Sequence, residues 1–299
     1  MTAQLPRLLT IVLAAGDGVR MRSGRPKALH EVAGRSMLAH LLAAILEIGD
    51  GDIAVVIGPD RDDVAAEAKR AAPSAEVFVQ HERRGTAHAV LAARDAILRG
   101  YRDVLVVYAD TPLLRNSTLV AMQKMLAQGV DMVALGFRPA DPTGYGRLIE
   151  REGRLVAIRE HKDASEEERA VRLCNAGPLA LRGANALDML DAVTPDNEQK
   201  EYYLTDLVEI AYGRGLVSCA IEADEREVMG VNDRAQLAIA EAVMQTRLRE
   251  AAMLRGVTLI APETVFLSFD TKIGRDVVIE PHVVLGKGVT IEEAAVIHS

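Results

Sequence analysis

The stretch LLTIVLAAGDGVRM, residues 8–21, decides the fold, because an unbroken apolar run passes directly into a loop with two glycines. Such a run, rich in aliphatic and β-branched residues, predicts a strand buried on both faces. Residues 8–15 follow Arg7 and have the length of a short signal-peptide core, but the sequence that comes next is unsuited to cleavage. We therefore interpret residues 8–13 as the first buried strand.

Further apolar runs alternate with helical patterns up to about Ala223, which is typical of a covered parallel sheet in an α/β fold. After Ser36, a predicted N-cap, apolar residues at helical spacing predict a helix that lies on the sheet. Between residues 145 and 181 short strands surround the charged stretch 160–169, which we expect to fold over the sheet edge as a substrate lid. The other strands are expected at residues 53–57, 77–80, 104–108 and 132–137, and the helix stripe at Met37, Leu38, Leu41, Leu42, Ile45 and Leu46.

The sequence from residue 234 onward follows a different pattern. Residues 234–255 predict one long helix that ends near Gly256. Beyond it, aliphatic residues recur every six positions, and this period is typical of the stacked coils of a parallel β-helix. The repeating positions are Leu267, Ile273, Ile279, Leu285, Ile291 and Ile297, with Val265, Val277, Val283 and Val289 in a second row.

These patterns predict three parts: an α/β domain over residues 1–232, a connecting helix over 233–256, and hexapeptide coils over 257–299. The repeat stops at Ser299 with no evident polar cap, so we expect a truncated piece of a longer protein.

Composition excludes several classes of function. The formal net charge of -8 opposes general attraction to nucleic acid or to an anionic membrane. Cys174 and Cys219 stand far apart, which argues against a disulfide framework or a thiolate zinc site and favours a reducing cytoplasm. No apolar stretch approaches the roughly 20 residues that span a bilayer, so we expect no membrane insertion.

The loop after the first strand carries the strongest chemical signal. Gly16 and Gly18 let the backbone approach a ligand, and Arg20 and Lys27 bring positive charge to its phosphates. A dinucleotide fingerprint would require a glycine at Met21, and the Walker loop would require Gly-Lys-Ser or Gly-Lys-Thr. The alternative is a plain glycine turn with two solvated cations.

A second signal is Asp110, which follows the buried run 104–108 where ligands of open α/β sheets bind. A carboxylate there is placed to hold Mg²⁺, which prefers oxygen ligands. The alternative is an Asp that caps the following helix. Gln80, Gly85 and Thr86 offer an amide and backbone donors for a base edge, with a loop and an N-cap threonine as the alternative.

Weaker signals lie in the inserted region. Gly144, Glu160 and Asn175 suit a hydroxyl-rich substrate, although Glu160 also fits a solvated charged run and Asn175 a turn. The histidines lack zinc-type or Ser-His-Asp spacing, and Gly-x-Ser-x-Gly is absent, so a protein nucleophile is not indicated.

Taken together, these motifs resemble the bacterial N-acetylglucosamine-1-phosphate uridyltransferase family over essentially the whole chain. The resemblance is carried by Leu13-Ala14-Ala15-Gly16-x-Gly-x-Arg20-Met21, Pro26-Lys27, Gln80, Gly85-Thr86, Tyr108-Ala109-Asp110, Gly144-Tyr145-Gly146-Arg147, Glu160-His161-Lys162-Asp163, Asn175, Glu201-Tyr202-Tyr203-Leu204-Thr205-Asp206 and Gly230-Val231-Asn232-Asp233. One departure is Val19, where the family usually has Thr, and we expect a modest loss of a phosphate contact there.

The resemblance implies a Rossmann-like, glycosyltransferase A-like nucleotidyltransferase domain followed by a short left-handed parallel β-helix. It implies Mg²⁺-dependent transfer of UMP from UTP to N-acetylglucosamine 1-phosphate for cell-wall and lipopolysaccharide precursors. Arg20 and Lys27 would meet the triphosphate, and Asp110 and Asn232 would bind Mg²⁺. Uracil would be held by Leu13, Ala14, Ala15, Gly16, Gln80, Gly85 and Thr86, and the sugar by Tyr108, Ala109, Gly144, Glu160, Asn175 and Thr205.

Enzymes of this family are bifunctional trimers whose β-helix acetylates glucosamine 1-phosphate with acetyl-coenzyme A. Because this chain has only a few coils, we do not expect that second site here, and trimerisation of this chain is doubtful. Two other interpretations stay open: a related pyrophosphorylase that uses glucose 1-phosphate or thymidine triphosphate, and a non-catalytic nucleotide-sugar sensor or scaffold.

Overall fold

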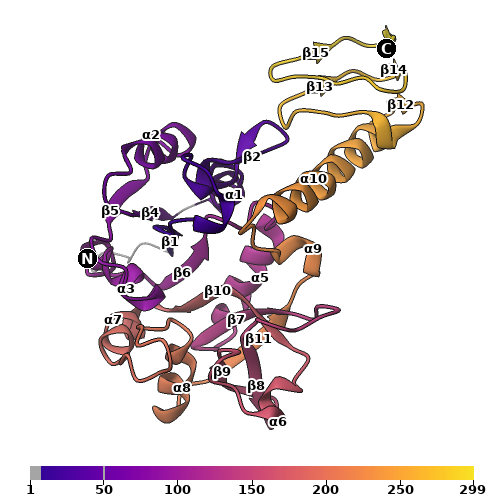
Figure 1. The fold of residues 1–299 in the computed structure, drawn as a ribbon. Helices are drawn as coiled ribbons and strands as arrows, with labels where there is room; N and C mark the ends of the chain where they lie inside the picture. The colour runs from indigo at the N-terminus through magenta and orange to yellow at the C-terminus, as the bar shows by residue number, and fades with distance from the viewer. Residues whose placement is uncertain (1–7, 50) are drawn as a thin grey trace.

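The computed structural model describes residues 8–49 and 51–299, and a mixed sheet forms the centre of the chain (Figure 1). Its strand order is β11-β7-β10-β6-β1-β4-β5. The strands are β1 (Leu8–Ala14), β4 (Asp52–Ile57), β5 (Glu76–Val79), β6 (Asp103–Tyr108), β7 (Met132–Phe137), β10 (Cys174–Arg182) and β11 (Ser218–Glu222). The five strands expected from the sequence are confirmed, except that Gln80 lies just beyond the end of β5.

The expectation of a parallel sheet is wrong at one strand. β1, β4, β5 and β6 pair in parallel, as do β7 and β11, but β10 runs antiparallel between β6 and β7. The segment expected at the sheet edge therefore supplies a central strand. From the same segment, the hairpin of β8 (Arg147–Arg151) and β9 (Arg154–Arg159) lies beside this strand order, where β8 pairs with β10, and α6 (Glu166–Arg169) follows the hairpin.

Each face of the sheet has its own apolar core, because successive side chains of a strand point to opposite faces. In β1, Leu9 and Ile11 belong to one core and Leu8 and Val12 to the other. The first core is covered by α3 (Thr86–Leu91), α4 (Arg94–Ile97), α7 (Gly183–Asp191) and α8 (Asp206–Gly213), and the second by α1 (Met37–Leu46), α2 (Asp62–Ala71) and α5 (Asn116–Ala127).

The helix after Ser36 forms as expected. The Ser36 hydroxyl oxygen accepts a hydrogen bond from the amide of Ala39 at 3.1 Å, which satisfies one free donor of the first turn of α1. The expected stripe is buried with one exception: Leu46 is 46% exposed at the last turn. The buried stripe thus ends at Ile45, one residue before the end of α1.

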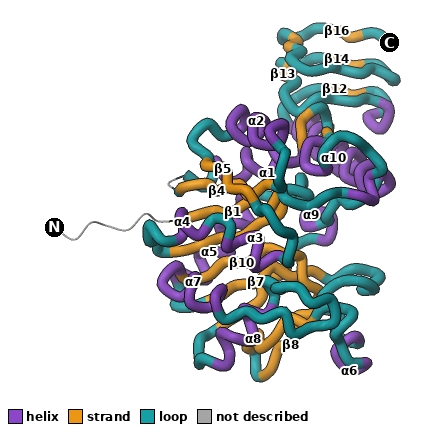
Figure 2. Tube along the Cα trace, turned by 60° about the vertical axis from the view of Figure 1, so that its left-hand side comes forward, coloured by secondary structure: helices purple, strands orange, loops and turns teal. Residues whose placement is uncertain are grey.

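After α9 (Glu225–Val228), the long helix α10 (Arg234–Leu254) leads away from the sheet to a stack of short parallel strands (Figures 1 and 2). Lys272 pairs with Thr290 and Val278 with Val296, so one coil takes 18 residues, or three hexapeptides. The expected inward positions form a single apolar cluster. These strands are β12 (Thr258–Leu259), β13 (Lys272–Ile273), β14 (Val278–Ile279), β15 (Thr290–Ile291) and β16 (Val296–Ile297).

The coils are tied to the rest of the chain by buried hydrogen bonds. The Gln245 side chain of α10 accepts from the amide of Leu267 at 2.8 Å and donates to its carbonyl at 2.7 Å. The Ala33 carbonyl, in the turn between β2 (Glu31–Val32) and β3 (Arg35–Ser36), accepts from the amide of Phe269 at 2.9 Å. Among the described residues, none of the helices is both long and apolar enough to cross a bilayer.

Candidate active site

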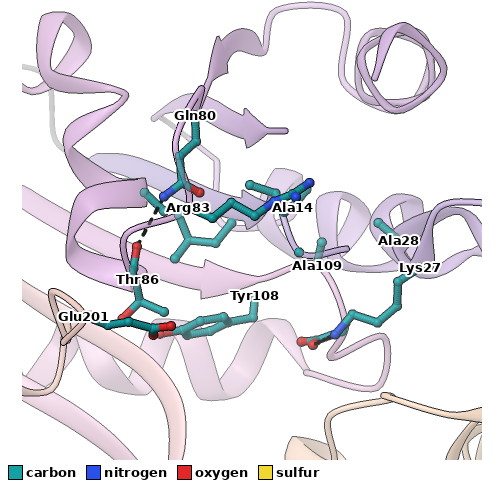
Figure 3. A pocket seen from close by; sticks show the side chains of 15 residues that line it. Ala14, Lys27, Ala28, Gln80, Arg83, Thr86, Tyr108, Ala109 and Glu201 are labelled. Atoms are coloured by element: carbon teal, nitrogen blue, oxygen red, sulfur yellow. Dashed lines mark hydrogen bonds and ion pairs between the residues drawn. The ribbon is translucent and has the colours of Figure 1, made fainter. Parts of the chain in front are cut away.

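Two adjoining cavities open at the carboxyl ends of β1 and β6. The first has a volume of about 240 Å³ and is lined by eleven of the sequence-predicted site residues (Figure 3). Those residues are Leu13, Ala14, Ala15, Gly16, Lys27, Gln80, Gly85, Thr86, Tyr108, Ala109 and Asp110. Ala109, which the resemblance places at the sugar, lines this cavity and not the second. The eleven residues come from four segments that lie far apart in the sequence, and the parallel pairing of β6, β1, β4 and β5 aligns the strand ends that precede them.

The second cavity, of about 380 Å³, shares Tyr108 and Asp110 with the first. Gly144, Glu160, Asn175 and Asn232 also line it, so the structure brings these sequence-predicted residues together. Thr205 lies behind its wall, where its hydroxyl donates to the Glu160 carboxylate at 3.2 Å. A ligand with two different ends could therefore occupy both cavities across the shared residues.

Lys27 stands beside the residues expected to bind a metal ion. Its ammonium group forms an ion pair with the Asp110 carboxylate and donates to Asn232 Oδ1 at 3.1 Å. The alternative interpretation of Asp110 as a helix cap is wrong, because α5 begins only at Asn116, with Arg115 as its N-cap. Asp110 thus faces a cation, as a site for charged ligands requires.

The donor set at this point fits a divalent metal ion. A carboxylate and an amide oxygen converge on one cation, the Lys27 ammonium, and hard cations such as Mg²⁺ prefer oxygen ligands. Mg²⁺ commonly takes one or two protein ligands and completes its shell with water and phosphate oxygens. Within residues 8–49 and 51–299, no group of three or more His, Cys, Asp or Glu side chains offers a complete protein cage.

Local hydrogen bonds hold Asn232 in place. Its backbone amide donates to Gln236 Oε1 at 2.7 Å, and the preceding amide of Val231 donates to the Asp110 carbonyl at 2.8 Å. The Asp233 side chain caps α10 by accepting from the amide of Gln236 at 2.8 Å. The start of α10 is thereby fixed against the strand end that carries Asp110.

The wall of the first cavity depends on glycine. Gly85 has φ 113° and ψ 176°, a conformation open essentially to glycine alone, and a Cβ there would lie 2.5 Å from the carbonyl oxygen of Tyr202. Gln80 is buried, and its amide group donates to the Gly85 carbonyl at 3.3 Å and contacts His88 Nδ1 at 3.2 Å. Thr86 is the first residue of α3 and not its N-cap; its hydroxyl accepts from the amide of Leu204 at 2.9 Å.

The wall of the second cavity contains the half-buried carboxyl group of Glu160. Burial raises the pKa of the Glu160 carboxyl, against the lowering effect of the hydrogen bond from Thr205. Asn175 lies in strand β10, at a register shift, and not in a turn. Its Oδ1 accepts from the amide of Gly177 at 3.0 Å, and the residue lines the cavity. Burial likewise raises the pKa of Tyr108, between the two cavities.

Some placements differ from what the motifs indicated. Arg20 is exposed on the short turn Val19–Met21 and lines neither cavity, and Val19 beside it is 80% exposed. Arg83 and Glu201, by contrast, line the first cavity, although sequence reasoning gave them no role. Glu201 opens one of the motifs that carry the resemblance, and Arg83 stands two residues before Gly85, so these positions in the sequence were the available signal.

Comparison with known proteins places the chain among nucleotide-handling enzymes. The model of the MobA-like NTP transferase domain matches residues 10–201. The Bifunctional protein GlmU of Azorhizobium caulinodans and that of Xanthobacter autotrophicus are each 60% identical over 98% of this chain, which spans 65% of the length of either relative. The family resemblance inferred from the motifs is confirmed.

A crystal structure of UDP-glucose pyrophosphorylase complexed with UDP-glucose has a TM-score of 0.62 at 15% identity, and the match covers 81% of this chain and 99% of that one. At that identity the likeness shows the fold, a mixed α/β Rossmann-like nucleotidyltransferase fold. By the match of residues 10–201, this chain belongs to the MobA-like NTP transferase domain family.

Proposed function

We propose that the chain is a nucleotidyltransferase that transfers UMP from UTP to N-acetylglucosamine 1-phosphate and releases pyrophosphate with Mg²⁺. The observation that carries this proposal is the cluster of Lys27, Asp110 and Asn232, with Asp110 at the boundary of the two cavities. A nucleotide in the first cavity and a sugar phosphate in the second would meet there. Relatives named Bifunctional protein GlmU support the assignment.

The residues divide into three groups under this proposal. Gln80 and the backbone of the first loop and of Gly85 would hold uracil, and Gly144, Glu160 and Asn175 would hold the sugar. Asp110 and Asn232 would bind Mg²⁺, which when bound neutralises phosphate charge. The other residues expected around the two substrates are Leu13, Ala14, Ala15, Gly16, Thr86, Tyr108, Ala109 and Thr205.

The reaction is a direct in-line displacement. A phosphate oxygen of the sugar phosphate forms a bond to the α-phosphorus of UTP, while the bond from that phosphorus to the bridging oxygen breaks and pyrophosphate leaves. Lys27 would offset the negative charge that grows on the leaving group, and the motif assigns Arg20 the same task. Positioning of the two substrates supplies the rest of the acceleration.

The proposal extends to organisation. We propose a nucleotidyltransferase domain over residues 1–232, a connecting helix over 233–256, and the start of a left-handed parallel β-helix over 257–299, in a cytoplasmic protein. The 18-residue pairing step of the coils supports the β-helix. Acetyl transfer and trimer formation would belong to a longer parent chain.

The direct test is pyrophosphate release from UTP with N-acetylglucosamine 1-phosphate, glucosamine 1-phosphate or glucose 1-phosphate, with Mg²⁺ or with chelator. We expect Mg²⁺-dependent release with the N-acetylated sugar alone. Release only with glucose 1-phosphate would place the chain in a sister activity. No release with any acceptor would favour a nucleotide-sugar sensor or a scaffold and would overturn the proposal.

A further inference from the structure

Arg83 links two loops of the first cavity. Its Nε donates to the carbonyl of Ala15 at 2.9 Å, and a terminal nitrogen lies 2.5 Å from Asp17 Oδ2. The guanidinium also packs on Gly58, where an added Cβ would lie 3.0 Å from it. Figure 3 shows Arg83 reaching across the cavity from the side of Gln80 toward Ala14.

The ion pair with Arg83 neutralises the negative charge of Asp17 in the glycine loop. A carboxylate in the middle of the glycine loop would repel a polyphosphate brought to that loop. The ion pair cancels this charge, and the hydrogen bond to Ala15 fixes the peptide group that leads to Gly16. The two side chains are 39% and 45% exposed, so the ion pair contributes little to folding stability. We therefore expect its main effect on the affinity for the ligand.

We propose that Arg83 is a positioning residue for the nucleoside triphosphate: it neutralises Asp17 and holds the Ala15–Gly16 backbone in its ligand-ready orientation. The inference rests on the proposed function, since it requires a triphosphate at the glycine loop. It concerns the nucleotide half of the site alone, because Arg83 lines the first cavity and is absent from the lining of the second.

The test is a double-mutant cycle of Arg83→Gln, Asp17→Asn and the double variant, with kcat, both KM values and the Kd for Mg²⁺–UTP by calorimetry. Arg83→Gln should raise the KM and Kd for UTP by about tenfold, with the KM for the sugar phosphate within twofold of wild type. The double variant should regain at least threefold of that loss. The matched control is Arg94→Gln, because the Arg94–Asp191 pair is similarly exposed, at 44% and 46%, but lies outside both cavities.

Several results would overturn the inference: unchanged UTP affinity in Arg83→Gln, an equal rise in both KM values, or no recovery in the double variant. Equal losses in Arg94→Gln would show a general effect of removing an ion pair. If wild-type protein binds UTP but releases no pyrophosphate, the proposed function fails while the calorimetric cycle still decides the role of Arg83. If wild type does not bind UTP, both proposals fall.

Discussion

The Nζ atom of Lys27 lies 3.1 Å from Oδ1 of Asn232, although 205 positions separate the two residues in the chain. The contact joins the segment after the first loop to the turn that begins α10. Both segments also contact Asp110 in the loop after β6: Lys27 pairs with its carboxylate, and the amide of Val231, beside Asn232, donates to its carbonyl. Three segments thus converge on one cation. Because the start of α10 supplies one of the three, the long helix helps to build the site as well as to carry the coils.

Lys27→Ala should cost turnover far more than stability. The substitution removes a positive charge from the place where charge develops on pyrophosphate, and loss of one such interaction lowers kcat by about 100-fold or more. Asp110 loses its ion pair but is partly exposed, so the melting temperature should fall only slightly. The checks are kcat and thermal unfolding, with exposed Lys124→Ala on α5 as control. Full activity with native melting would show that Lys27 has no catalytic role.

Asn232→Ala should raise the Mg²⁺ concentration needed for half-maximal activity. With one of the two protein oxygen ligands gone, the ion must be held by Asp110, water and phosphate, and we expect a rise of about tenfold. Activity is titrated with Mg²⁺ at saturating UTP, and chelator should abolish it in every variant. An unchanged Mg²⁺ dependence in Asn232→Ala would exclude this residue as a ligand.

Asp206→Asn should make folding stability less dependent on pH. Burial raises the pKa of Asp206 from 3.8 to about 6, so its contribution to stability is fully present below pH 3.8 and is lost as the pH rises through 6. The half-buried carboxylate is screened by solvent, and the variant should gain about 1 kcal/mol between pH 4 and pH 8 relative to wild type.

Urea unfolding at the two pH values measures this gain. Asp191→Asn is the opposite control, since its hydrogen bonds from Arg94 lower the pKa of Asp191 and its contribution is lost as the pH falls. Parallel pH profiles for wild type and Asp206→Asn would contradict the assignment.

Gly85→Ala should damage both folding and nucleotide binding. The residue must adopt a conformation that only glycine reaches easily, and its new methyl would meet the backbone of Tyr202. We expect a loss of about 3 kcal/mol of unfolding free energy. Gly144→Ala is the matched control, because Gly144 also has a positive φ, of 83°, but an added Cβ there would have no neighbouring atom within 4 Å. This substitution should lower the unfolding free energy by about 1 kcal/mol. Equal losses would show that the contact with Tyr202 is unimportant.

Gln245→Ala should loosen the coils and spare the catalytic site. It leaves the buried amide and carbonyl of Leu267 without their side-chain partner, which costs about 3 kcal/mol. Hydrogen exchange should accelerate in residues 258–297 and stay unchanged around β1 and β6. Exposed Gln128→Ala, after α5, is the control. Uniform acceleration over the whole chain would show that the coils and the sheet unfold as one unit.

Local pattern was sufficient for much of the fold. The apolar runs gave the strands β1, β4, β5, β6 and β7, Ser36 marked the start of α1, and the six-residue period located the apolar cluster of the coils. These features depend on neighbours in the chain, since side-chain period reflects local backbone geometry. The motifs likewise named most of the residues that line the two cavities.

Pattern alone could not place residues that act through distant partners. Cys174–Arg182 has a strand-like composition, but its position between β6 and β7 depends on which strand edges are free once the others have paired. In the sequence, Arg83 is an ordinary charged loop residue. Only the pairing of β4 with β5 brings it to Ala15 and Asp17.

The sequence by itself determined the elements, the glycine loop and the chemical types present at the strand ends. Only the tertiary structure decided that β10 runs antiparallel, that Arg20 stands outside the cavities while Arg83 lines one, and that Lys27, Asp110 and Asn232 meet. The physical reason is range: periodicity and capping act over a few residues, whereas strand order and ion pairing depend on which surfaces the whole chain buries together.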